Sequence, residues 1–458
     1  MNFNFNSIDF RSEKNLVKPN PLSPCLGLGA AALLLLCSAA AFADDTQLAR
    51  DDRVAELERK VEVLAEELAR VRTQVAVPET PELVSSFGLG PAASKVYGVE
   101  GGLSIGGYGE GNYRNFIGDE SDTDLDRADF LRLVLYLGYK FSDRIVFNSE
   151  IEFEHATTDD VGNGSGSGSA SVELASLDFF WNERINARAG LLLLPMGFLN
   201  EVHEPPFYYG VTRPETEQRI LPSTWREAGI GVFGRLTEEV SYRAYLVNGF
   251  NAQRFSDSGI RSGRQKGSRA LAEDFGLVGR LDWTPDAFPG LLLGGSLYLG
   301  DSGQDVETAL ADVPDARLWI AEGHLQYRRG PLHTRAMFAY TQLSDARDLN
   351  LALDRPFDRP IAERMLGGYA EVAYDLAPQL FGDDLRKLAP FLRVEYVDTQ
   401  FEVPSGYRPN RANAYWVWTP GIQYHPHANV ALKLEYRNFV ARDGSRPDEL
   451  ALGMGFAF

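Results

Sequence analysis

The chain has 458 residues, enough for several ordinary domains or for one large barrel. Its net charge of −19 argues against nucleic acid as a partner. Outside the N-terminus, no apolar run reaches the length of about 18 residues that a membrane-spanning helix needs. The mean hydropathy is slightly negative, but strands that alternate apolar and polar residues hide both of their faces in such an average.

The first 43 residues have the organisation of an export signal. Basic residues lie ahead of an apolar stretch over 26–41, and Ala41-Phe42-Ala43 matches a small-x-small cleavage site. We therefore predict a signal peptide over 1–43 that is removed from the mature protein. Because Cys25 and Cys37 are the only cysteines and both fall in this segment, the mature chain has no disulfide and no thiol chemistry.

Residues 44–77 are predicted to form a short helical coiled coil, placed in the periplasm by the export signal. Apolar residues repeat at heptad a and d positions with mixed charges between them, and Pro78 and Pro81 end the helix ahead of a linker over 78–100. Such a coil would help protomers associate, as in a homotrimer. The alternative is a lone amphipathic helix. The heptad positions are Val54, Leu57, Val61, Leu64, Leu68, Val71 and Val75.

After residue 100 the sequence changes to a period of two, which is the period of β-strands. Leu133, Leu135 and Leu137 share one face of a segment whose other face carries polar residues. Carboxylates at 150, 152 and 154 lie on one face of the next segment, where a packed core would make them costly. An aliphatic band on one face and charges on the other predict lipid outside and water inside.

The alternating segments number sixteen, an even number, as a closed barrel requires. Short turns and long loops alternate between them, and a barrel of this size encloses an aqueous channel. The fold class is therefore all-β, a 16-stranded antiparallel transmembrane β-barrel over 101–458. The expected strands are 103–116, 127–141, 145–156, 171–182, 185–195, 227–237, 240–250, 274–284, 290–299, 316–328, 331–343, 366–376, 389–401, 412–425, 428–441 and 449–458.

The last expected strand is amphipathic and ends in an aromatic residue. Leu450, Leu452, Met454, Phe456 and Phe458 share one face. This pattern resembles the assembly signal of outer-membrane barrels, with Phe458 as its terminal residue. The alternative is an ordinary edge strand. Together with the export signal, it predicts an integral multi-pass protein in the outer membrane of a Gram-negative bacterium, in contact with membrane lipid.

The third long loop, 196–226, is too rich in proline and aromatic residues for a flexible outer loop. Pro205 and Pro206 stiffen it, and Tyr208, Tyr209 and Trp225 can pack it down. A sixteen-strand lumen needs an inward constriction with placed charges to be selective. We therefore expect this loop to fold into the barrel.

Three stretches of the barrel region have a recognisable sequence: LLLLPMGFLNEVHEPPFYYGVTRPETEQRILPSTWREAGIGVFG, SEIEFEHA at 149–156 and APFLRVEYVD at 389–398. With these stretches, the chain over about 100–458 resembles the phosphate-selective porin O and P family of outer-membrane porins. The resemblance implies a trimeric sixteen-strand porin with a folded-in third loop and basic residues at the constriction. In this chain the acids of the loop outnumber its bases, a departure that bears on phosphate selectivity.

The candidate pore residues follow from the loop and from the inward strand faces. The alternative for each inward charge is a structural ion pair. The expected anion contacts are Arg132, Arg188, Arg213, Arg219 and Arg226. The acids expected to oppose them are Glu201, Glu204, Glu215 and Glu217, and the pore lining also includes His203, Glu150, Glu152 and Glu154.

The expected function is a water-filled channel for passive diffusion of small ions or hydrophilic solutes, with anion or phosphate selectivity as its finer form. The alternative is a structural or adhesive outer-membrane barrel without an open channel. His203-Glu204 lacks the second histidine of a zincin motif, and histidines are few. We expect no enzymatic activity, no catalytic residues, no cofactor and no metal.

Overall fold

The computed structural model describes residues 83–118, 125–160, 167–382, 386–444 and 446–458, together with 53, 56 and 59–63. The chain divides into two compact units, 1–81 and 82–458. In the first unit the described residues are helical, and Lys60 pairs with Glu56 one turn earlier at 2.8 Å. The signal peptide over 1–43 and most of the coil expected over 44–77 lie outside the described residues.

No described helix is both long enough and apolar enough to cross a membrane.

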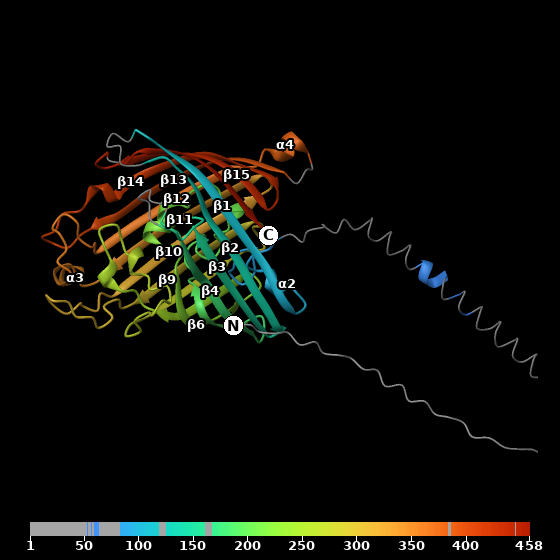
Figure 1. Cartoon of the computed structure of the whole chain (residues 1–458), viewed down its shortest axis with the longest axis horizontal. Helices are drawn as coiled ribbons and strands as arrows, with labels where there is room; N and C mark the ends of the chain where they lie inside the picture. Colours follow the sequence, from blue (N-terminus) through green and yellow to red (C-terminus); the bar gives the residue numbers. More distant parts are fainter. Residues whose placement is uncertain are drawn as a thin grey trace, which may run out of the picture. The chain divides into compact units, whose positions relative to one another are not determined.

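In the second unit, the described residues form sixteen strands that close into one antiparallel barrel (Figure 1). This confirms the predicted fold class, and the strand ends fall within two residues of those expected from the alternation. The strands are β1 (Gly102–Ile117), β2 (Arg127–Ser142), β3 (Ile145–Glu154), β4 (Ser169–Phe180), β5 (Asn186–Leu193), β6 (Arg226–Arg235), β7 (Val240–Asn248), β8 (Phe275–Trp283), β9 (Leu291–Gly300), β10 (Leu318–Arg329), β11 (Leu332–Leu343), β12 (Arg364–Tyr374), β13 (Lys387–Glu402), β14 (Ala414–His427), β15 (Val430–Ala441) and β16 (Asp448–Ala457).

The barrel closes where the first strand pairs with the last. Tyr108 of β1 is in register with Ala457 of β16, and with Val134 of β2 on its other side. Beyond β16, the backbone of Phe458 exchanges two hydrogen bonds with Gly107, at 2.9 and 3.0 Å. The terminal residue therefore completes the seam of the barrel.

The outer face carries the aliphatic band that alternation predicts. Leu137, Leu277 and Leu297 are exposed on it, and so are the aromatic side chains of Trp418 and of Trp283, the last residue of β8. An apolar belt edged by aromatic residues is the surface that a bilayer requires of a barrel. The structure therefore supports an outer-membrane β-barrel.

The two ends of the barrel carry different connections. Tight turns such as Asp143–Arg144 lie at one end, with α4 (Ala377–Phe381) and α2 (Lys95–Gly98), and α3 (Ala346–Ala352) lies at the opposite end (Figure 1). Short turns mark the periplasmic side of such barrels. The single-turn segments within loops are η1 (Pro205–Phe207), η2 (Thr216–Ile220), η3 (Ala252–Arg254), η4 (Arg261–Gly263) and η5 (Arg411–Asn413).

Much of the lumen is filled by inward-folded chain. Trp225 and Phe250 pack with Phe255 and with Tyr298 of β9 in a buried aromatic cluster. At the short-turn end, the segment 83–99 packs its apolar residues against inward side chains of β1 and β2. The described part of the expected linker is therefore docked inside the barrel.

Candidate constriction and its charged residues

The third loop folds inward and is closed at its base by one side chain. The Asn200 amide donates to the carbonyls of Leu194 and Trp225 at 2.7 and 2.8 Å, and its oxygen accepts from the Trp225 N–H at 2.5 Å. All three residues are buried. These bonds join the end of β5 to the start of β6, so the residues between them project into the barrel.

Two glutamates of the loop are held at the short-turn side. Glu201 pairs with Arg243 of β7 at 2.5 Å. The fully buried Glu204 carboxylate accepts the N–H groups of Ala92 and Ala93 at 2.9 and 3.1 Å. Burial raises the pKa of Glu204 to about 7, although both N–H donors act in the other direction.

The other two loop glutamates bind the opposite wall. Glu215 pairs with Arg437 of β15 at 2.5 Å and accepts from the Tyr415 hydroxyl at 2.8 Å. Burial acts to raise the pKa of Glu215, but Arg437 and Arg219 lower it overall, well below its ordinary range. Glu217 accepts from the Leu199 N–H and the Tyr369 hydroxyl at 2.6 and 2.7 Å. All four loop glutamates are thus engaged within the protein.

Most of the candidate arginines are also paired. Arg188 makes a bidentate contact with Asp178 at 2.7 and 2.8 Å, and both side chains are buried. Arg226 pairs with Glu173 at 2.6 Å, and Arg219 pairs with Glu215 at 3.3 Å. Arg132 is shared between two carboxylates, Glu110 at 2.7 Å and Glu152 at 3.0 Å.

Arg213 differs from these arginines. It is buried, donates to the Thr224 hydroxyl at 3.0 Å and leaves its second terminal nitrogen without a hydrogen-bond partner. Within the described part of the chain, no carboxylate pairs with it. A buried guanidinium with unused donors is a ready contact for an anion.

Two further arginines of this kind come from the loop between β7 and β8. Arg261 donates to the Gln218 carbonyl at 3.4 Å, and Arg264 donates to the carbonyls of Pro222 at 2.8 Å and of Thr224. Burial lowers the pKa of Arg261 to about 9 and that of Arg264 to about 10, and neighbouring arginines lower both further. Positive charge without an ion-pair partner among the described residues is therefore concentrated here, although the carboxylates of Glu173 and Glu227 act against the lowering at Arg264.

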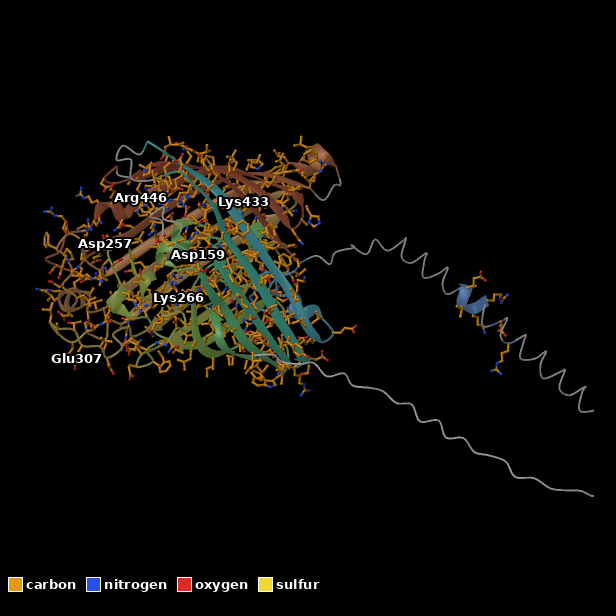
Figure 2. All side chains as sticks on the ribbon, in the orientation of Figure 1. Asp159, Asp257, Lys266, Glu307, Lys433 and Arg446 are labelled. Carbon is orange, nitrogen blue, oxygen red and sulfur yellow. The ribbon has the colours of Figure 1, made fainter. Side chains whose placement is uncertain are left out.

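These arginines line a cavity of about 440 Å³ on the long-loop side of the barrel. Figure 2 places Asp257, from the same loop, toward the end that carries α3. No ion pair joins a basic lining residue to a carboxylate among the residues that the structure describes. The cavity is lined by Arg254, Arg261, Ser262, Arg264, Gln265, Lys266 and Ser268.

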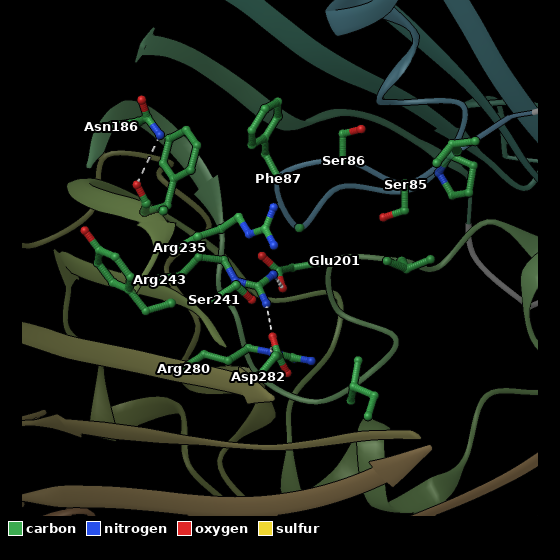
Figure 3. A pocket seen from close by; sticks show the side chains of 18 of the residues that line it. Ser85, Ser86, Phe87, Asn186, Glu201, Arg235, Ser241, Arg243, Arg280 and Asp282 are labelled. Atoms are coloured by element: carbon green, nitrogen blue, oxygen red, sulfur yellow. Dashed lines mark hydrogen bonds and ion pairs between the residues drawn. The ribbon is translucent and has the colours of Figure 1, made fainter. Parts of the chain in front are cut away.

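A larger cavity of about 1220 Å³ opens at the short-turn end. In Figure 3, Arg243 and Arg280 converge on Asp282, and Glu201 lies beside Arg243. The same cavity is lined by Arg328, which donates to a His333 ring nitrogen at 3.1 Å, and by Arg335, which donates to the Gln326 amide oxygen at 2.9 Å. Both ends of the barrel thus present guanidinium groups to water.

The remaining candidates lie on the wall formed by β3 and β4. Glu150 and Glu152 are buried and face inward, and Glu154 accepts from the Ser169 hydroxyl at 3.1 Å near the long-loop end. His203 reaches from the third loop to Glu150 at 3.0 Å. The structure thus brings His203 and the first two glutamates together in the interior and leaves Glu154 at the rim.

The sequence candidates do not include Arg261 and Arg264, because they come from the third loop and the strand faces, whereas these two arginines lie in the loop between β7 and β8. The available signal was the composition of 258–271, which contains four basic residues and no acidic one. The docking of 83–99 was also not predicted from the sequence, because a segment of small and apolar residues after two prolines is typical of a linker. The burial of that segment depends on Glu204, which lies far away in the chain.

No family model matches the chain. An uncharacterized protein of Aquifex aeolicus (strain VF5) is 36% identical over 376 residues, which cover 80% of this chain and 82% of that protein. The chain belongs to the same family as this Aquifex aeolicus protein. The family assignment carries no activity with it, so function has to be argued from the barrel.

Solved structures of three outer-membrane proteins are similar at lower identity. OmpT of Vibrio cholerae with loop L8 deleted is 12% identical, with a TM-score of 0.49 and coverage of 79% of this chain and 100% of that one. The channel DcaP of Acinetobacter baumannii is 14% identical, with a TM-score of 0.49 and coverage of 78% of this chain and 97% of that one. An anion-selective porin from Comamonas acidovorans is 11% identical, with a TM-score of 0.47 and coverage of 78% of this chain and 100% of that one. Likenesses this distant support no functional argument, and the fold rests on the strand pairing above. The resemblance to the phosphate-selective porin O and P family stays a prediction.

Proposed function

We propose that the protein is an outer-membrane porin through which small hydrophilic anions diffuse. The observation that carries the proposal is the group of Arg213, Arg261 and Arg264, which contact only hydroxyl and carbonyl oxygens among the described residues. Positive charge held in a cleft with low-dielectric walls raises the local concentration of anions. Charge placed at a narrow passage also sets its selectivity.

The acids of the third loop do not cancel this field. Glu201 and Glu215 neutralise arginines of the wall, and Glu204 caps the backbone of the docked segment. A count of charges along the loop suggests an acidic constriction. The pairing supports a basic one, because the carboxylates that outnumber the arginines are already engaged elsewhere.

The second cavity supports the same direction of selectivity. Arg328 and Arg335 line it without a carboxylate partner among the described residues, and they lie at the opposite end of the barrel from Arg261. An anion would therefore meet guanidinium groups on both sides of the third loop. Weak binding at more than one site favours conduction over trapping.

Phosphate is the anion to test first. The planar guanidinium group matches the oxygens of phosphate, and the third loop resembles that of phosphate-selective porins.

A homotrimer with the coil in the periplasm belongs to the same proposal. Light scattering of the detergent-solubilised protein, with and without residues 44–77, tests that assembly.

The decisive experiment is single-channel recording in a planar bilayer with a salt gradient. We expect a reversal potential shifted toward that of chloride, and a chloride current that falls when phosphate is added. The double variant Arg213→Gln with Arg261→Gln should move the reversal potential toward that of the cation. Arg317→Gln is the matched control, because Arg317 is exposed and pairs with Asp301 away from both cavities. A cation-selective wild type would contradict the proposal.

The second candidate is a structural or adhesive barrel without an open channel. It is favoured by the packed interior and by the segment 83–99, which occupies part of the short-turn end. The two candidates differ in conductance. If folded protein gives no openings, and deletion of 83–99 gives none either, the porin proposal fails and the closed barrel replaces it.

A further inference from the structure

A buried cluster joins the third loop to the barrel wall. His203 Nε2 lies 3.0 Å from an oxygen of Glu150 on β3 and 3.8 Å from an oxygen of Glu173 on β4. One ligand atom from each of the three side chains lies within 4.8 Å of the other two. At most 3% of each side chain is exposed.

The orientation of the imidazole leaves its inner nitrogen free to bind a metal. His203 Nδ1 faces the Asn200 carbonyl at 3.1 Å, and a carbonyl only accepts, so Nδ1 carries the proton. In the neutral ring Nε2 then presents a lone pair toward two carboxylates. A ring N–H held by a backbone carbonyl is the usual support of a metal-binding histidine.

Several polar atoms around the cluster lack a hydrogen-bond partner, including the Nε atoms of Arg132 and Arg226, one carboxylate oxygen and one hydroxyl. The second oxygen of Glu173 accepts no hydrogen bond, although that residue is buried. The hydroxyl of Tyr108 is also buried and unpartnered, and its ring centre lies 5.9 Å from that of His203. Buried polar atoms nearly always have a partner, so orphans that gather in one place point to a missing ligand.

The charges of the cluster point to a cation. Glu110, Glu150, Glu152 and Glu173 are connected through these contacts to only two guanidinium groups, those of Arg132 and Arg226. In these contacts the carboxylates therefore exceed the guanidinium groups paired with them by two, and all four carboxylates are buried. Buried charge of one sign is costly unless a counter-charge is supplied.

We propose that Glu150, Glu173 and His203 bind a first-row divalent metal ion that fastens the third loop to the barrel wall. Two carboxylates and one imidazole suit Zn²⁺, Mn²⁺ or Fe²⁺. Ligand bonds of about 2.0–2.2 Å place neighbouring ligand atoms about 3–3.5 Å apart, close to the separations observed. The Tyr108 hydroxyl or a water would complete the coordination.

The test supplies metal during refolding, because the finished site is enclosed. Full-length protein is unfolded in denaturant that contains EDTA, freed of both, and refolded in detergent with Zn²⁺, with Mn²⁺ or with neither. Bound metal is then measured by mass spectrometry after gel filtration. We expect one ion per chain and a higher unfolding temperature with metal. Glu173→Gln and His203→Gln should each lose the ion and the shift in unfolding temperature.

The chain offers a matched control in a second buried histidine. His324 also contacts two carboxylates, of Glu322 and Asp282, but Asp282 is already paired with Arg280, and His324 lies outside the proposed site, so His324→Gln should keep the ion. If His203→Gln does not fold, Glu173→Gln and the wild type still decide the question. Folded wild type that takes up no ion overturns the proposal and leaves a protonated His203 bridging the glutamates. None of these readouts uses conductance, so the anion channel stands or falls separately.

Discussion

The charges of the barrel wall and those of the long-loop cavity are arranged in opposite ways. Arg393 and Arg437 are buried on β13 and β15, and each contacts two carboxylates. Arg261 and Arg264 contact only backbone carbonyls. The first arrangement holds strands and loop together, and the second leaves positive potential for a ligand. Pairing, rather than the number of charges, therefore decides what each region can do.

The largest effect should come from breaking a paired arginine in the wall. Arg437→Met removes the partner of Glu215 and of Glu449 while keeping most of the volume. Removing one member of a buried pair leaves an uncompensated charge and costs about 3–5 kcal/mol. Urea unfolding of the detergent-solubilised protein measures this loss. The exposed pair of Arg364 and Glu402 is the control, where Arg364→Gln should cost less than about 1 kcal/mol.

The next largest effect should be a pH dependence of the docking of segment 83–99, which Glu204 holds. Its pKa is about 7 when docked and returns near 4.5 once the carboxyl meets water. The docked state therefore binds the proton more tightly. Its contribution to docking is complete below pH 4.5 and is lost as the pH rises through 7. The free energy of docking should therefore change by about 3.5 kcal/mol between these pH limits, since the shift is about 2.5 pKa units at about 1.4 kcal/mol each.

Hydrogen exchange of the Ala92 and Ala93 amides, corrected for intrinsic rates, measures this docking. Protection should be weaker at pH 8 than at pH 6. Glu204→Gln cannot titrate, so its protection should be the same at both values. Equal protection in the wild type would mean that Glu204 titrates normally.

A smaller cost should follow from filling the space at Gly210 of the third loop. This residue has a φ of +85°, and a Cβ would lie 2.7 Å from a Glu435 oxygen and 3.1 Å from an Arg393 nitrogen. Gly210→Ala therefore strains the backbone and crowds two buried charged side chains. We expect a loss of about 1–3 kcal/mol, measured by thermal unfolding. Gly330→Ala also replaces a glycine with positive φ but meets no atom within 4 Å, so it separates strain from crowding.

The strands could be predicted from the sequence because alternation is local and repeats sixteen times. The inward fold of the third loop was also predictable from its prolines and aromatic residues. The partners of its charges were not. Glu215 meets Arg437 across 222 positions of the chain, and no local pattern encodes such a contact. Likewise, the grouping of His203 with Glu150 and Glu173 could not be predicted, because the two glutamates come from separate strands.

The smallest effect tests the other side of the comparison, where an unpaired arginine is removed. Burial and the neighbouring Arg264 and Arg213 lower the pKa of Arg261, so the folded state disfavours its charge. Arg261→Gln should therefore leave the free energy of unfolding unchanged or raise it by up to about 1 kcal/mol. Urea unfolding in low salt gives the value, and added salt should shrink any gain because it screens repulsion. A site that keeps a charge unpaired for a ligand is expected to be less stable than a neutral one. A loss as large as that of Arg437→Met would instead mean that Arg261 is a structural residue.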